Sequence, residues 1–353
     1  MLKTKLFTAI ALAAVLLLLA PAAYAAEGTT TGSFGAASQP PTVDSIEIYS
    51  DAGLLNPVTL LNPMTPQATF YAKVTVSSPH KLKHLDYVKV NLFYNNSGNV
   101  NMLAPADPGG ADTQVCAILT CTVGPPASWT MVPVGGGTTW SIVPGSCSQP
   151  ANLNTNLPGD WVFAFKPGEV AHEATNSAAP GPDVWDAQGK AIDKTPLSGE
   201  KYVRTKGMNF YGEITVNTAG VDWGVVPLGL TFDNDTYNPE TGISITYLAN
   251  GDYEGDIKST DWAGATDNVT LDVTGSNPPG NPGEFGLEAN DTSDNTTAVT
   301  VLKAAYTPID ATGTITPEGG VTVATNTLWL ALSASGILPE TYSGSIYYQI
   351  ANR

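Results

Sequence analysis

The stretch that decides the fold is residues 209–253, which opens with FYGEITV at positions 210–216. Every second residue of this run is apolar or small, which is the period-two pattern of a half-buried β-strand. A turn-rich acidic loop follows, and the alternation returns in ISITY at positions 243–247. Asn250-Gly251 then gives the strongest short signal for a hairpin. The stretch therefore predicts antiparallel β-structure.

The same alternation recurs towards the N-terminus, most clearly in FYAKVTV at 70–76 and in WVFAF at 161–165. Helical periodicity is nearly absent, so we predict an all-β chain. A polar, Pro- and Gly-rich segment interrupts the pattern, and we expect it to be a linker over 181–205. The prediction is two antiparallel β-sandwich domains in tandem, residues 43–180 and 206–353.

The first 26 residues are expected to be a secretory signal peptide. Lys3 and Lys5 give a positive start, an apolar run follows, and Ala23-Tyr24-Ala25 offers small residues for cleavage. The apolar run is about 15 residues, short of the roughly 20 that span a bilayer. Residues 27–42 are expected to be a flexible tether. We therefore expect an extracellular or cell-surface protein with no membrane span after signal cleavage.

The charge balance excludes a nucleic-acid role. The chain has 15 Lys and Arg against 32 Asp and Glu, and a formal net charge of −17. Binding to phosphates requires a basic surface, which this composition does not provide. Five Asn-X-Ser/Thr sequons are possible glycosylation sites for an exported chain: Asn95, Asn234, Asn268, Asn290 and Asn295.

One family resemblance is carried by the C-terminal part of the chain. WGVVPLG at 223–229, then ISITYLANG at 243–251 and the ending TYSGSIYY at 341–348 resemble Ig-like domains of bacterial and archaeal secreted and cell-surface proteins. The resemblance covers residues 221–353, and the N-terminal part shows only general Ig-like character. It implies a structural, adhesive or envelope-associated role, and it carries over no catalytic residues.

Few constellations in the sequence suggest binding chemistry. Asp233, Asp235 and Glu240 share one oxygen-rich loop that could hold Ca²⁺, although its spacing does not match an EF-hand. No other cofactor is indicated. Trp185 and Trp262 are flanked by polar or small residues, and we expect these two tryptophans to be exposed ligand-binding aromatics. No catalytic motif is found, so we expect no enzyme activity.

The three cysteines all lie in the first predicted domain. Cys116 and Cys121 fall on opposite faces of one extended run, roughly 16 Å apart, and cannot bridge. If residues 115–123 pair with 138–143 as antiparallel neighbours, Cys116 lies close to Cys147. We therefore predict a Cys116–Cys147 disulfide, which leaves Cys121 as a buried free thiol or as an intermolecular link.

Taken in order of preference, three functions fit these patterns. The first is a structural or adhesive protein without catalytic activity, which contacts other envelope or extracellular components. The second is a secreted carbohydrate-binding module that recognises polysaccharide. The third is an extracellular filament subunit that self-associates by donating a strand to its neighbour.

Overall fold

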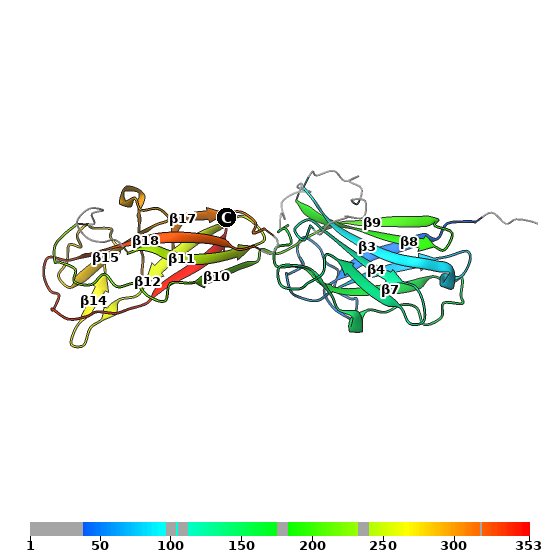
Figure 1. The fold of residues 1–353 in the computed structure, drawn as a ribbon, viewed down its shortest axis with the longest axis horizontal. Coiled ribbons are helices and arrows are strands. Elements are labelled where there is room, and N and C mark those ends of the chain that lie inside the picture. Colours follow the sequence, from blue (N-terminus) through cyan, green and yellow to red (C-terminus); the bar gives the residue numbers. More distant parts are fainter. Residues whose placement is uncertain (1–37, 97–103, 105–111, 175–182, 232–239, 318–319) are drawn as a thin grey trace, which may run out of the picture. The chain divides into compact units, whose positions relative to one another are not determined.

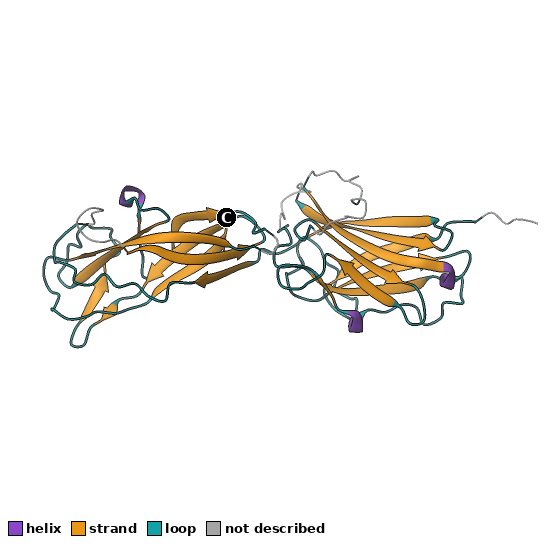
Figure 2. Cartoon of the chain, in the orientation of Figure 1, coloured by secondary structure: helices purple, strands orange, loops and turns teal. Residues whose placement is uncertain are grey.

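The computed structural model describes residues 38–96, 104, 112–174, 183–231, 240–317 and 320–353. The predicted signal peptide and residues 27–37 of the predicted tether lie outside these ranges. Figure 2 shows strands throughout, with three short 3₁₀ helices, η1 (Leu82–His84), η2 (Pro144–Ser146) and η3 (Asn295–Thr297), and no α-helix in the described ranges. The all-β prediction is confirmed. No helix in these ranges is long and apolar enough to cross a membrane.

The strands up to residue 206, here called the N-terminal half, form two antiparallel sheets (Figure 1). The first has the order β1-β2-β7-β6, with β1 (Thr42–Tyr49), β2 (Phe70–Ser77), β7 (Gly159–Lys166) and β6 (Ser141–Ile142). The second has the order β5-β4-β3-β8-β9, with β5 (Ser128–Val132), β4 (Cys116–Thr122), β3 (Leu85–Asn95), β8 (Val184–Asp193) and β9 (Ser198–Lys206).

The predicted linker over 181–205 is wrong. Strands β8 and β9 occupy most of it, and β8 pairs along its whole length with β3 in the five-stranded sheet. Trp185 and Ala187 of β8 point into the core, while Asp186 and Gln188 point to the other face. The polar residues that suggested a linker are thus the outward half of a period-two pattern.

The two sheets of the N-terminal half share one hydrophobic core, which is consistent with a β-sandwich. Ile46 and Val74 from the four-stranded sheet belong to the same buried cluster as Val90 and Ala187 from the five-stranded sheet. Gly189 of β8 marks their close approach, because a Cβ atom there would lie 3.2 Å from Val74 and 3.3 Å from Ile46.

The strands from residue 212 onwards, here called the C-terminal half, also form two main sheets. The larger sheet has the strand order β10-β11-β18-β15-β14-β13, and β16 pairs with β15 beside this order. Its strands are β10 (Gly212–Val216), β11 (Glu240–Ala249), β18 (Thr322–Leu332), β15 (Glu284–Asn290), β14 (Asn268–Leu271), β13 (Trp262–Ala263) and β16 (Val299–Thr300). The smaller runs β17-β12-β19: β17 (Thr307–Gly313), β12 (Tyr253–Ser259) and β19 (Ile346–Asn352). Only the β14–β15 pair is parallel among the paired strands.

Residues 209–253 form strands as predicted, but the prediction of a hairpin at Asn250-Gly251 is wrong. Strand β10 pairs antiparallel with β11. The next strand, β12, belongs to the smaller sheet and does not pair with β11. Asn250 is completely buried, and its side chain accepts a bond from Tyr211 N at 2.6 Å and donates to Asn209 O at 2.9 Å. These bonds hold Asn250 where the chain passes from one sheet to the other.

The WGVVPLG run at 223–229 forms no regular strand, although it carried part of the family resemblance. A single bridge joins Leu228 to Leu332, and Val225 is 96% exposed. Trp223 alone of this run packs onto the core of the C-terminal half. Of the closing segment at 341–348, only residues 346–348 lie in a strand, β19, which pairs with β12 along its whole length.

Candidate functional site

The predicted calcium loop lies almost entirely outside the described residues. Asp233 and Asp235 fall there, and Glu240 begins β11 with a side chain that is also not described. Within the described ranges, no three His, Cys, Asp or Glu side chains gather closely enough to hold a metal ion. The calcium site therefore stays a prediction from the sequence.

Two of the five sequons carry asparagines whose amides are buried and bonded. Asn95 is 2% exposed and donates to Asp186 Oδ2 at 3.1 Å. Asn290 is 3% exposed and donates to Asp294 O at 2.6 Å. A glycan attached to either nitrogen would displace these bonds, so we do not expect glycosylation of the folded chain at these two positions.

The other three sequons differ in accessibility. Asn268 is exposed at the start of β14, and Asn295 is half-buried in η3. Asn234 lies outside the described residues. Asn268 and Asn295 are therefore the described sequons that an attached glycan fits.

The prediction of an exposed Trp185 is wrong. Trp185 is completely buried, and its indole N–H donates to His172 O at 2.8 Å. Trp262 is half-buried, with its ring centroid 4.8 Å from that of Phe285 and 5.7 Å from that of Trp223. Trp185 thus belongs to the protein interior, whereas Trp262 packs against other aromatic rings and keeps part of its surface exposed.

The strand pairing behind the predicted Cys116–Cys147 disulfide is also wrong. Strand β4, which contains Cys116, pairs with β3 and β5, and not with residues 138–143. Cys116 packs with Phe93 on the face of β4 opposite to Cys121. No disulfide links the three cysteines in the structure.

A group of buried and partly buried charged side chains lies around Asp186, which is 1% exposed on β8. Its carboxylate accepts bonds from Arg204 Nη1 at 2.6 Å, Asn95 Nδ2 at 3.1 Å and Thr205 N at 3.0 Å. Thr205 has a φ of 64°, which non-glycine residues rarely adopt, and it lies at a register shift between β8 and β9. This local conformation directs the Thr205 N–H at the carboxylate.

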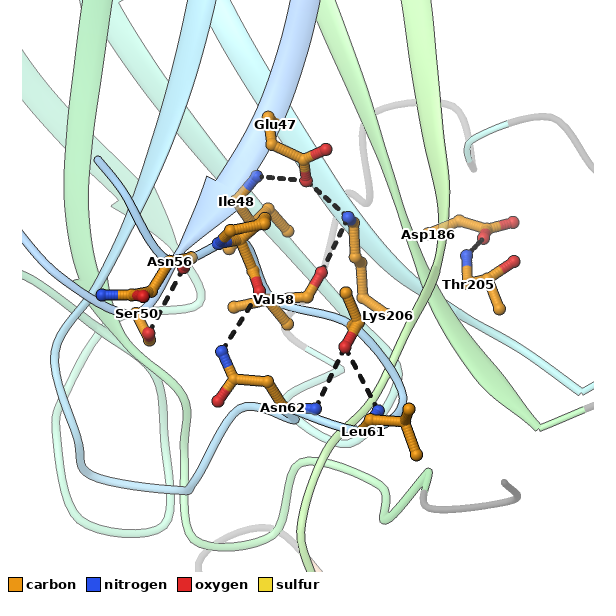
Figure 3. A network of polar contacts seen from close by, with 12 residues as sticks. Glu47, Ile48, Ser50, Asn56, Val58, Leu61, Asn62, Asp186, Thr205 and Lys206 are labelled. Atoms are coloured by element: carbon orange, nitrogen blue, oxygen red, sulfur yellow. Dashed lines mark hydrogen bonds and ion pairs between the residues drawn. The ribbon is translucent and has the colours of Figure 1, made fainter. Parts of the chain in front are cut away.

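The neighbouring residue, Lys206, makes a second buried charged contact (Figure 3). Lys206 is 5% exposed, and its ammonium forms an ion pair with Glu47 of β1. It also donates to Val58 O at 2.8 Å, while Val58 N donates to Ile48 O at 2.8 Å. Lys206 thus joins the end of β9 in one sheet to β1 and its following loop in the other.

The loop that supplies Val58 is itself held by side-chain bonds (Figure 3). Thr59 Oγ1 accepts from Leu61 N at 3.2 Å and from Asn62 N at 3.0 Å. Asn62 Nδ2 donates to Pro57 O at 3.1 Å. The carbonyl that receives Lys206 is therefore held by a turn with several local side-chain hydrogen bonds.

A row of polar side chains continues across the outward face of the same five-stranded sheet. Gln188 is 5% exposed, accepts from Asn91 Nδ2 at 2.9 Å, and donates to Glu200 Oε2 at 2.7 Å. The Gln188 amide also donates to the Tyr202 hydroxyl at 2.8 Å. The Arg204 guanidinium lies 4.7 Å from the centroid of the Tyr202 ring.

These contacts are suited to holding strands together and not to chemical turnover. Both oxygens of Asp186 accept hydrogen bonds, and the carboxylate is enclosed by protein. It is therefore not free to take a proton from a ligand, which is the geometric requirement for a general base. The Lys206 ammonium is likewise enclosed and has two acceptors.

A different buried polar cluster lies in the C-terminal half. Asn326 is completely buried, and neither its Oδ1 nor its Nδ2 makes a hydrogen bond of normal geometry in the described structure, although the Tyr247 hydroxyl lies near the amide. The same holds for the hydroxyls of Tyr247 and Tyr348 and for Asp256 Oδ1. Burial raises the pKa of Tyr247 to about 12, with the nearby Asn326 amide acting in the opposite direction. Burial and then the Glu254 carboxylate raise the pKa of Asp256.

Sequence reasoning missed Asp186, Arg204 and Lys206 because they lie in or directly beside the predicted linker. The alternation of Trp185 and Ala187 with Asp186 and Gln188 was the available signal. No protein-family model matches the chain, and no curated protein matches it either.

Proposed function

We propose that the chain is an exported structural or adhesive protein of the cell surface, without catalytic activity, built from two Ig-like β-sandwich domains. The sequence supports export through its charged, apolar and small-residue leader pattern. The all-β fold supports the architecture, because each half has two main sheets around its own hydrophobic core.

One observation carries the proposal. The described side chains with the strongest binding chemistry serve the fold itself: Asp186, Arg204 and Lys206 bond to protein groups, and Trp185 lies in the core. A scaffold or adhesive protein needs a stably folded domain of this kind and binds its partners through the surface of that domain. Catalysis instead requires reactive groups directed at a ligand.

The carbohydrate-binding alternative has less support. It needs an open aromatic face, and the two tryptophans expected to provide one pack against protein groups. Filament assembly by strand donation remains the second alternative. It requires an open strand edge, and β10 at the edge of the larger C-terminal sheet has a largely exposed residue pattern.

The test is to locate the full chain in the cells that make it and to compare its ligands. We expect it in the envelope or medium, with an N-terminus near residue 27, and accessible to protease added to intact cells. Retention of the chain in the cytosol would refute the proposal. Pull-down on insoluble polysaccharides would favour the carbohydrate alternative if the chain were retained, and filaments in electron micrographs would favour strand donation.

A further inference from the structure

Two of the three cysteines approach each other inside the N-terminal half. Cys121 is completely buried on the inward face of β4, where it is paired with Trp129 of β5. Cys147 directly follows η2, and the next residue, Ser148, forms a bridge with Val162 of β7. Cys121 thus belongs to the five-stranded sheet, and Cys147 lies beside the four-stranded sheet.

Three contacts join the surroundings of the two cysteines. Trp129, beside Cys121, packs edge-on against Phe163 of β7, with ring centroids 5.1 Å apart. Ala164, next along β7, donates its N–H to Cys147 Sγ at 3.3 Å. Further along each segment, Gln149 Nε2 donates to Gly124 O at 2.6 Å. The strand beside Cys121 and the residues that follow Cys121 therefore contact the strand beside Cys147 and the residues that follow Cys147.

The acid–base behaviour of the thiols agrees with this placement. Burial, and then negative charge on Cys147, raise the pKa of Cys121 to about 12. Burial also raises the pKa of Cys147, but the Ala164 N–H lowers it in part. Cys147 is half-buried and Cys121 fully buried, so Cys147 is the thiol that an external reagent reaches first.

Cys116 cannot replace Cys121 in this arrangement. The two residues are five positions apart on one strand and point to opposite faces. Cys116 packs with Phe93 and Ile118 in a separate cluster outside the shared core.

We propose that Cys121 and Cys147 form a disulfide bond that links the two sheets of the N-terminal half. The bond would join β4 to the segment beside β7. It would close a loop that contains β5, β6 and η2 between its ends. This inference does not depend on where the chain is located, because the pairing follows from the fold and can be tested in vitro.

The oxidant is a small-molecule or protein disulfide, and the reaction is two thiol–disulfide exchanges. The Cys147 thiolate attacks one sulfur of the oxidant, which forms a mixed disulfide and releases the first oxidant thiolate. Cys121 then attacks Cys147 Sγ, the second oxidant thiolate leaves, and the proton of Cys121 is transferred to that thiolate. The two cysteines are oxidised by two electrons, and one oxidant disulfide is reduced to two thiols.

The experiment is to refold the full chain from urea with oxidised and reduced glutathione and to map its peptides without reduction. We expect one Cys121–Cys147 peptide in the wild type and in the matched control Cys116→Ser. In Cys121→Ser, we expect a glutathione adduct to accumulate on Cys147. Reduction of the wild-type bond should lower the Tm of the N-terminal half by roughly 5–10 °C, because it restores freedom to the unfolded chain.

Either of two results would overturn the inference. One is a Cys116–Cys147 peptide in the refolded wild type. The other is a refolded wild type in which Cys121 and Cys147 both remain alkylatable after oxidation. Because the wild type and Cys116→Ser decide the pairing, the result does not depend on whether the Cys121 and Cys147 variants fold.

Discussion

Two buried polar residues, one in each half of the molecule, are placed in opposite ways. In the N-terminal half, Asp186 is 1% exposed and accepts bonds from Arg204, Asn95 and Thr205. In the C-terminal half, Asn326 is completely buried, and within the described structure neither of its amide atoms is bonded. Both halves have the same kind of fold, so sheet architecture alone does not determine how polar groups are satisfied.

The difference predicts opposite responses to mutation. Removing one partner from a bonded, buried pair leaves the other group buried without compensation, which is costly. Removing a buried polar group that has no partner takes away a desolvation penalty and costs little. The comparison can therefore be tested by matched substitutions in the two halves.

The largest effect is expected from Arg204→Met, which removes the ionic partner of Asp186. The carboxylate would stay buried with only neutral donors, so we expect a loss of about 3–5 kcal/mol in the free energy of unfolding. Urea denaturation followed by tryptophan fluorescence measures this loss.

The matched control for this prediction is Lys73→Met. It removes an ion pair of 2.8 Å between Lys73 and Asp160, whose side chains are 30% and 48% exposed. Exposed pairs contribute about 1 kcal/mol or less. Equal losses for Arg204→Met and Lys73→Met would show that burial of Asp186 has no energetic importance.

The region around Asp186, with its strands β8 and β9, was also the part of the fold hardest to predict from sequence. FYAKVTV at 70–76 was identified because its inward residues are large and apolar, and β2 alternates in burial along its whole length. Strand β8 has the same period, but small residues such as Ala187 and Gly189 fill its inward face. Small inward residues allow the sheets to approach closely, yet they give a weak hydrophobic signal.

Strand pairing was beyond the reach of local patterns. Asn250-Gly251 has the sequence of a tight hairpin turn, but bonds from its side chain to Tyr211 and Asn209 fix it at a passage between sheets. Cys116 was assigned the wrong neighbour because β4 pairs with β3, which precedes it in the chain, and with β5. Such pairings depend on contacts between distant residues, which short windows of sequence do not record.

The second prediction concerns Asn326→Leu in the C-terminal half. Leucine has a similar size and removes two buried polar atoms that have no partner in the described structure. We expect a gain of about 1–2 kcal/mol in the free energy of unfolding. A loss of stability in urea denaturation would instead show that the amide is bonded in solution, for example by a buried water molecule.

The third prediction concerns pH and Glu288, on β15. Burial raises the pKa of Glu288 from 4.5 to about 7, so folding favours the protonated carboxyl. The stability contributed by this protonation is fully present below pH 4.5 and is lost as the pH rises to about 7. Allowing for screening by solvent, we expect a loss of about 1 kcal/mol over this range.

Glu288→Gln should reduce this pH dependence, because glutamine does not titrate. Urea denaturation at several pH values between 4 and 8 compares this variant with the wild type. An unaltered slope in Glu288→Gln would contradict the prediction.

The smallest effects are expected from removing one hydroxyl in each half. The Tyr202 hydroxyl accepts a bond from Gln188 at 2.8 Å, whereas the buried Tyr348 hydroxyl has no partner in the described structure. Tyr202→Phe leaves a buried amide donor with one acceptor fewer, so we expect a loss of about 1 kcal/mol. Tyr348→Phe removes a hydroxyl that is desolvated on folding without gaining a hydrogen bond. We therefore expect the free energy of unfolding to change by no more than about 0.5 kcal/mol. Because both substitutions delete the same atom from the same residue type, packing differences are small and the hydrogen bond decides the outcome. A greater loss for Tyr348→Phe than for Tyr202→Phe, measured by urea denaturation, would reverse the expected contrast between these two sites.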